Sequence, residues 1–243
     1  MSIWGKLIGG AAGLAIGGPI GALIGIVVGH AVLDAPATRR ALNEPDRRQV
    51  AFTIAAIALA AKMAKADGDA SDIEFAAFRR LFHVDPGEEA NVVRFYRFAH
   101  RSADGYEAYA RQAAQLFGPG SPILEDLLDA LFLIARADGV VSAEEMDYLR
   151  TVGGHLGFEA RRFAQIRSRH VPLDHDDPYA VLDVAPEADL DTIKAAYRRM
   201  VKDHHPDRHI AAGVPHEFIR VAEARMAAIN AAYRTILKEH GAA

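Results

Sequence analysis

The segment LDTIKAAYRRMVKDHHPDR, residues 190–208, decides how the last third of this chain is expected to fold. Its apolar residues recur three and four positions apart, at Leu190, Ile193, Tyr197, Met200 and Val201. This spacing places them along one face of an amphipathic helix. Pro206 ends that helix, because the residue before a proline avoids the α-helical backbone region. The segment therefore predicts a helix followed by a sharp turn at residues 204–208.

Further helices are predicted on both sides of this segment. Residues 177–182, DPYAVL, indicate a short apolar helix before it, and a final helix is expected from about His216 to Glu239. The buried face of the final helix is predicted to carry Phe218, Ala222, Met226, Ile229, Tyr233 and Ile236. Two antiparallel helices joined by a loop form a helical hairpin. The tip of this hairpin, residues 204–208, reads HHPDR.

Four elements in this order carry a resemblance: DPYAVL, the basic helix, the tripeptide His205-Pro206-Asp207, and INAAY at residues 229–233. Together they are similar to the J-domain of DnaJ-type co-chaperones, over residues 176–243. The resemblance implies that the chain stimulates the ATPase of a DnaK-type chaperone. A client protein is implied too, but its identity does not follow.

The chaperone-binding residues implied by the resemblance are His205, Pro206, Asp207, Lys194, Arg198, Arg199 and Lys202. The four cations lie on a helix face away from the apolar stripe, where they can steer the domain toward an acidic partner surface. Asp207 is expected to pair with an arginine of the chaperone. Pro206 is expected to fix the loop, and His205 to donate hydrogen bonds that hold the tip or contact the partner.

The middle region, residues 49–170, is predicted to be a compact helical bundle with an internal repeat. AKADG at residues 64–68 returns as ARADG at residues 135–139, and each copy is followed by Ser and then Glu three positions later. The glycine is expected to end one helix, and the Ser and Glu to open the next with a capping box. The two helical hairpins are therefore expected to be related by approximate two-fold symmetry. This region resembles the tellurite-resistance TerB-like domain.

Two groups of residues suggest metal sites, and each also has a simpler explanation. Asp67, Asp69, Asp138 and Glu145 are weak candidates, since neither copy of the repeat has the ligand spacing of a calcium loop and helix capping explains the residues. The histidines His204, His205 and His209 suggest zinc. Adjacent histidines point to different helix faces, however, and a fourth ligand is not evident. No metal or other cofactor is expected.

The first 33 residues predict a transmembrane helix. Residues 7–29 contain no charged residue, which is enough helix to cross a hydrocarbon core of roughly 30 Å. A glycine at every fourth position forms a bare stripe that favours close helix pairing in lipid, with Gly9, Gly13, Gly17, Gly21, Gly25 and Gly29 as the expected homodimer face. A cleaved signal peptide and a flexible arm are the alternatives. A linker is expected at residues 34–48. Its arginines predict that the domains after it lie on the cytoplasmic side of a bacterial inner membrane.

The whole chain of 243 residues is thus predicted to be all-α. It has no cysteine, which excludes disulfides and thiol catalysis, and its net charge of −4 does not favour a nucleic-acid partner. No catalytic motif points to an enzyme. The three regions together resemble the DjlA family of membrane-anchored DnaJ-like co-chaperones. The alternative is a non-enzymatic membrane stress adaptor whose TerB-like domain binds a metal or a protein.

Overall fold

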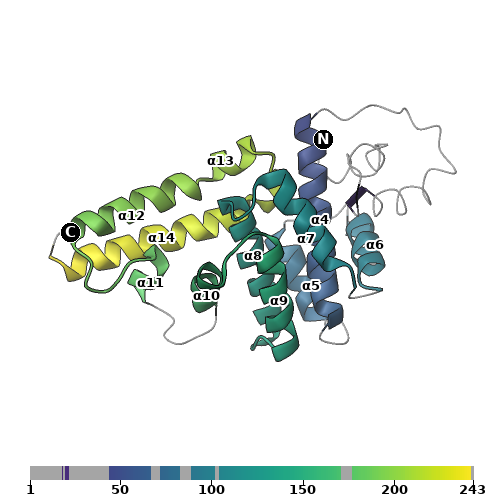
Figure 1. Cartoon of the computed structure of the whole chain (residues 1–243), viewed down its shortest axis with the longest axis horizontal. Coiled ribbons are helices and arrows are strands. Elements are labelled where there is room, and N and C mark those ends of the chain that lie inside the picture. Colours follow the sequence, from purple (N-terminus) through teal and green to yellow (C-terminus); the bar gives the residue numbers. More distant parts are fainter. Residues whose placement is uncertain are drawn as a thin grey trace.

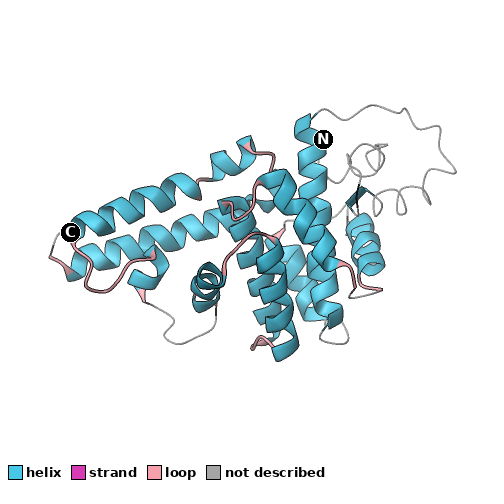
Figure 2. Ribbon diagram, in the orientation of Figure 1, coloured by secondary structure: helices cyan, strands magenta, loops and turns pink. Residues whose placement is uncertain are grey.

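The computed structural model describes residues 18, 20–21, 44–66, 72–82, 89–101, 104–170 and 177–241. Within these ranges the chain is helical and contains no strand, which confirms the all-α prediction (Figure 2). Residues 44–168 form a bundle, and residues 177–241 form a second body that we call the hairpin unit. In Figure 1 the long helices of the hairpin unit project from one side of the bundle.

The bundle consists of α4 (Glu44–Ala66), α5 (Asp72–Leu81), α6 (Glu89–Ala99), α7 (Tyr106–Phe117), α8 (Pro122–Ala135), the 3₁₀ turn η1 (Arg136–Asp138), α9 (Ala143–His155) and α10 (Ala160–Ser168). The hairpin unit consists of α11 (Pro178–Leu182), α12 (Leu190–Asp203), α13 (Pro206–Ala211), the 3₁₀ turn η2 (His216–Phe218) and α14 (Ile219–Glu239). Helix α4 begins at Glu44, inside the segment 34–48 that was assigned to a linker.

Helix α4 is the centre of the bundle. Every side chain from Val50 to Ala64 is buried, so the helix is covered on all sides. Its many alanines allow α6, α7, α8 and α9 to pack closely around it. The Tyr148 hydroxyl of α9 donates a hydrogen bond of 2.8 Å to the Leu59 carbonyl of α4. A helix that is apolar all round is stable only in such an interior.

The second copy of the repeat has the predicted capping geometry. Ser142 caps α9: its hydroxyl accepts the Glu145 N–H at 3.1 Å, and the Glu145 carboxylate accepts the Ser142 N–H at 2.8 Å. Gly139 ends η1 with a φ of 128°, a conformation that glycine adopts without strain. In the first copy, residues 67–71 lie outside the described residues. The two helix pairs α4–α5 and α8–α9 pack on one another, since α4 contacts α9 and α5 contacts α8.

The hairpin unit has its own small core. Helices α11 and α12 pack on α14 through the buried residues Leu182, Ile193, Met200, Ile229, Ala232 and Ile236. The rings of Tyr197 and Tyr233 stack with centroids 3.9 Å apart, which ties α12 to α14. Asp189 caps α12 by accepting the Thr192 N–H at 2.7 Å. The predicted antiparallel helices are therefore present at the predicted positions.

A second apolar contact joins the hairpin unit to the bundle. Val214, Phe218, Ile219 and Val221, from the loop before α14 and its first turn, belong to the bundle core. The Phe218 ring lies 5.2 Å from Phe52 of α4 and 4.5 Å from Phe82, measured between centroids. The long loop after the tip thus inserts into the bundle and fixes the hairpin unit to it.

The predicted transmembrane helix lies almost entirely outside the described residues, including Gly9, Gly13, Gly17, Gly25 and Gly29. Of the described residues there, Gly21 is buried, and Ile20 is buried with its N–H donating to Gln112 of α7 at 3.0 Å. Across the described ranges, no helix combines the length and apolar character that crossing a bilayer requires.

We predict that Phe218→Ala lowers the free energy of unfolding by about 3–5 kcal/mol, because it removes a ring packed between two helices of the bundle. Urea unfolding of the full chain measures the change. Val140→Ala removes an exposed side chain and is the control, with an expected change within about 0.5 kcal/mol. A Phe218→Ala effect as small as the control would contradict the insertion.

Candidate functional site

The tip of the hairpin is the start of a short helix. His205 is the N-cap of α13, and Pro206 occupies the first helical position, where its missing N–H has no consequence. The Asp207 N–H donates to His205 Nδ1 over 3.2 Å. The histidine therefore holds the tip as an acceptor, whereas the sequence suggested a donor. The backbone of the tripeptide is fixed before any partner binds.

The side chains of the tip and of the basic face are open to solvent. The Asp207 side chain is 86 % exposed and that of His205 is 50 % exposed. Lys194, Arg198, Arg199 and Lys202 are all exposed on α12, opposite the buried residues of the same helix. Arg208 binds the end of α12 through Asp203 at 2.8 Å. A charged surface of the predicted kind is thus available to a partner.

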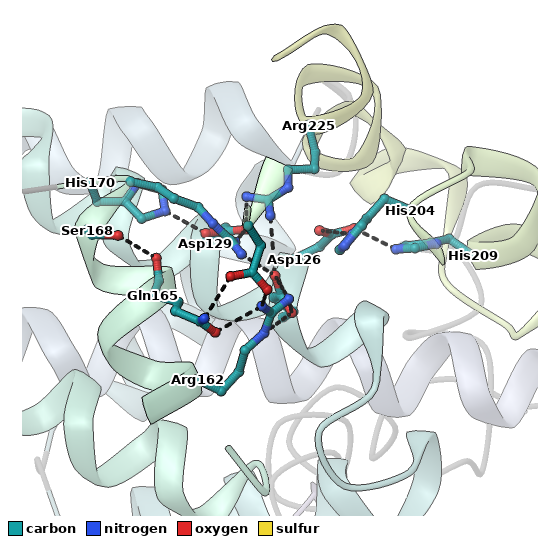
Figure 3. A network of polar contacts seen from close by, with 12 residues as sticks. Asp126, Asp129, Arg162, Gln165, Ser168, His170, His204, His209 and Arg225 are labelled. Atoms are coloured by element: carbon teal, nitrogen blue, oxygen red, sulfur yellow. Dashed lines mark hydrogen bonds and ion pairs between the residues drawn. The ribbon is translucent and has the colours of Figure 1, made fainter. Parts of the chain in front are cut away.

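A buried network of charges lies behind this surface (Figure 3). Its centre is α8, whose residues Glu125, Asp126 and Asp129 are each no more than 5 % exposed. Asp129 lies one helical turn from both other acids, four positions from Glu125 and three from Asp126, so the three carboxylates lie close together. Buried carboxylates are stable only when cations or hydrogen-bond donors compensate them. Here the compensating groups come from α10, the residues just after it, and the hairpin unit.

Glu125 and Asp129 are bound mainly by arginines. Arg169 reaches Glu125 at 2.7 Å and Asp129 at 3.3 Å, and Arg225 of α14 reaches the same two carboxylates at 3.3 and 3.1 Å. Arg162 of α10 adds a bidentate contact to Glu125, with its shortest distance 2.8 Å. Arg225 is thereby a direct ionic connection between the hairpin unit and the bundle.

Asp126 is bound by two histidines of the hairpin unit. Its Oδ1 lies 3.0 Å from His204 Nδ1, and its Oδ2 lies 2.6 Å from His209 Nε2. Both imidazoles are 3 % exposed. These histidines lie on either side of the tripeptide in the sequence. The residues that hold the tip against the bundle are therefore close to His205 and Asp207, which face solvent.

The network shifts the acidity of its carboxyl groups. Burial alone would raise the pKa of Asp129, but the positive charges of Arg225 and Arg169 and the bond from His170 outweigh it, and its pKa lies well below its usual range. Burial would also raise the pKa of Asp126, but the hydrogen bonds from His204 and His209 outweigh this effect. The pKa of Asp126 is therefore lowered as well. Both groups are therefore ionised in the folded protein at neutral pH.

A smaller polar contact lies at the other end of the interface. Asp183, at the end of α11, accepts from Arg162 at 2.9 Å and from Gln165 at 2.7 Å. Asp183 has a positive φ of 55°, which an aspartate tolerates better than most residues. The hairpin unit is thus held to α10 as well as to α8.

The weak metal candidates of the repeat are not gathered into a site within the described residues. Asp138 is exposed, Glu145 is engaged in its capping box, and Asp67 and Asp69 lie outside the described ranges. Among the residues that the structure describes, one group of three potential ligands has its donor atoms within 4.8 Å of one another: Asp126, His204 and His209. His205 does not belong to this group.

Sequence reasoning missed the network at the interface. The segment PILEDLLDALFLIA of α8 carries its three acids within an otherwise apolar run, and such acids are buried only with partners. That pattern was a usable indication of buried charge. The partners themselves were not predictable, because His204 is 78 residues from Asp126 and Arg225 is 96 residues from Asp129.

Three family models match the chain in sequence order. Residues 1–41 match the co-chaperone DjlA transmembrane domain, residues 53–168 match the tellurite resistance protein TerB, and residues 177–240 match the DnaJ domain. The hairpin unit is therefore a J-domain, and the bundle is a TerB-type domain.

Curated relatives are similar over nearly the whole chain. The co-chaperone protein DjlA of Photobacterium profundum is 28 % identical, over 98 % of this chain and 99 % of its own. That of Coxiella burnetii is also 28 % identical, over 96 % and 97 %. No solved structure matches.

We predict that stability depends on Asp129 in a pH-dependent way. Its pKa is lowered by folding, so its contribution is complete above the unfolded-state pKa of about 4 and is lost as pH falls below that value. Asp129→Asn is expected to cost about 3 kcal/mol at pH 7, since it leaves two buried arginines undercompensated.

Urea unfolding of wild type and Asp129→Asn across pH measures this contribution. The difference between the two proteins should shrink progressively as the pH falls from about 5 toward 2. Glu144→Gln, at an exposed position of α9, is the matched control and should change little at any pH. A wild-type advantage that stays constant with acidity would contradict the lowered pKa.

Proposed function

Because this chain carries the three domains of the DjlA co-chaperones in their order, we propose that it stimulates the ATPase of a DnaK-type chaperone from a membrane tether. One observation of the fold supports this most. The His205 and Asp207 side chains of the tripeptide and the basic face of α12 remain exposed although the J-domain is anchored to the bundle.

The proposed mechanism is binding without chemistry on this chain. The cations of α12 steer the J-domain toward an acidic surface of the chaperone and orient it there. The Asp207 side chain, which is largely exposed to solvent, pairs with an arginine of the chaperone. Such a contact accelerates ATP hydrolysis only if it favours the hydrolysing conformation of the chaperone over the others.

The anchor to the bundle determines how the J-domain is presented. The interface combines the apolar insertion of Phe218 with the ionic contacts of Arg225, His204 and His209, so the domain does not pivot freely. A fixed orientation reduces the conformational entropy that is lost on binding. The bundle thus fixes the orientation in which the J-domain presents its binding surface.

We predict that the full-length protein in detergent micelles raises ATP hydrolysis by its DnaK partner severalfold, and that His205→Gln abolishes the increase. The substitution alters the cap that fixes the tip as well as the exposed imidazole. Single-turnover hydrolysis by the chaperone, with and without the protein, measures the effect.

His216→Gln is the matched control, since it makes the same change at an exposed histidine of the J-domain outside the tip. It should stimulate like wild type. Absence of stimulation by wild type would refute the co-chaperone function and leave the stress adaptor as the better hypothesis. Equal stimulation by His205→Gln would refute the role of the tripeptide alone.

The membrane placement is part of the same proposal. We place residues 1–33 in the inner membrane as a single span, with contacts to lipid, and the glycine stripe from Gly9 to Gly29 as a homodimer face. This placement requires the Ile20 N–H to release Gln112 of α7 when the segment enters the membrane. The TerB-type domain and the J-domain then lie in the cytoplasm, where a DnaK-type chaperone finds ATP.

We predict that protease added to sealed spheroplasts leaves the J-domain intact, because the excess of arginines after the span retains that side in the cytoplasm. Immunoblotting for the carboxyl terminus gives the readout, and permeabilised cells are the positive control for cleavage. Digestion of the J-domain in sealed spheroplasts would reverse the orientation.

A further inference from the structure

The interface between the two domains gathers three metal-ligand side chains. Asp126 comes from α8, His204 from the end of α12 and His209 from α13, and one donor atom of each lies within 4.8 Å of the others. All three residues are buried. In Figure 3 the two imidazoles approach the Asp126 carboxylate from the same side of the network.

The charge balance differs at this point from the rest of the network. Glu125 and Asp129 each contact two or more arginines, but the two bonded partners of Asp126 among the described residues are imidazoles. Imidazoles are neutral when they act as metal ligands. The Asp126 carboxylate is thus the one acid of α8 without a permanently cationic partner in the described part of the chain.

The hydrogen bonding of His209 is also incomplete. Its Nδ1 is buried and has no hydrogen-bond partner among the described residues, while its Nε2 faces Asp126. A buried polar atom without a partner costs about 1–3 kcal/mol, so some further contribution must favour keeping this imidazole in the interface. An ion bound at Nε2 would add to the attachment that the Asp126 carboxylate already gives this ring, and it would leave Nδ1 without a partner.

We propose that Asp126, His204 and His209 form a binding site for a divalent transition-metal ion, with Zn²⁺ as the best match. Two imidazoles and one carboxylate are a common zinc ligand set, and the fourth position is taken by water or another small ligand. Neither calcium nor magnesium suits the site, because these ions prefer oxygen ligands.

The distances are compatible with an ion after a small adjustment. Ligand atoms about 2.0–2.1 Å from a tetrahedral zinc are separated by roughly 3.3 Å. The separations of 3.0 and 2.6 Å are hydrogen bonds from the two imidazoles to different oxygens of Asp126, so each imidazole moves away from its oxygen by less than 1 Å as the ion replaces the shared proton. The two imidazole nitrogens, which are at most 4.8 Å apart, must come to the same spacing. Arg169 and Arg225 lie nearby and weaken binding, but Glu125 and Asp129 compensate their charges.

The location gives such an ion a defined effect. Its ligands would come from both domains, and two of them flank the tripeptide His205-Pro206-Asp207. The bound ion would therefore fasten the tip of the J-domain to α8. This site involves none of the acidic residues of the repeat and does not depend on the proposed DnaK contact.

The test is equilibrium dialysis of the full-length, chelator-stripped protein in detergent against Zn²⁺, without any chaperone. We expect one tightly bound zinc per chain and a zinc-dependent rise in the melting temperature. Asp126→Asn and His209→Leu should each lower the affinity at least 100-fold and remove the rise. His216→Gln, at an exposed histidine of the J-domain outside the tip, should retain both.

A second readout reports the ligands directly. Co²⁺ in the same site should give the intense visible absorption of a tetrahedral complex, and His209→Leu should remove it. His209→Leu is also the safeguard if Asp126→Asn fails to fold, since leucine fills the buried position with an apolar side chain.

Two outcomes would overturn the proposal. One is a wild-type protein that takes up no stoichiometric zinc, in which case the group is a hydrogen-bonded contact only. The other is uptake that His209→Leu leaves unchanged, which would place the ion elsewhere. Because the chaperone is absent from these measurements, neither outcome bears on ATPase stimulation.

Discussion

Three carboxylates lie side by side on α8 and are almost fully withdrawn from water. Such a group of like charges is stable only where cations and donors surround it closely. The bundle alone supplies Arg162, Arg169 and His170. The J-domain supplies Arg225, His204 and His209. The requirement to compensate buried charge therefore determines where the J-domain sits.

The same constraint separates anchoring residues from exposed ones over a very short stretch. His204 and His209 are buried against α8, while His205 and Asp207 between them face solvent. The junction between α12 and α13 makes this alternation feasible, since His205 has an extended backbone conformation between the two helices. The binding surface and its attachment are thus built from adjacent residues, and neither occupies the space of the other.

Local sequence patterns were sufficient to predict much of the fold. The capping box of Ser142 and Glu145 and the stop at Pro206 depend on residues within one turn of helix, so spacing alone reveals them. The hairpin of α12 and α14 follows from apolar residues three and four apart. The complete burial of α4 does not follow from local patterns, because alanine is compatible with either a surface or an interior, and only the surrounding helices show that its whole circumference is buried.

The contacts between domains were beyond such reasoning. The sequence suggests zinc at the tip with the histidines alone as ligands, whereas the group of potential ligands in the structure includes Asp126 of the other domain and omits His205. The loop between α13 and α14 inserts into the bundle, and no local sequence pattern predicts this contact. Its purpose became evident only from Phe218, which fills a gap between Phe52 and Phe82.

Helix α14 has a consequence for how the molecule can be divided. Its first residues, Ile219 and Val221, lie in the bundle core, and its later residues, Ile229 and Ile236, lie in the core of the hairpin. A single rigid rod is therefore shared by two hydrophobic interiors. A fragment that begins at Asp177 would carry away part of the bundle's interior and expose apolar side chains to water. The two domains occupy separate parts of the sequence, but neither can be removed without exposing apolar side chains of a core that both share.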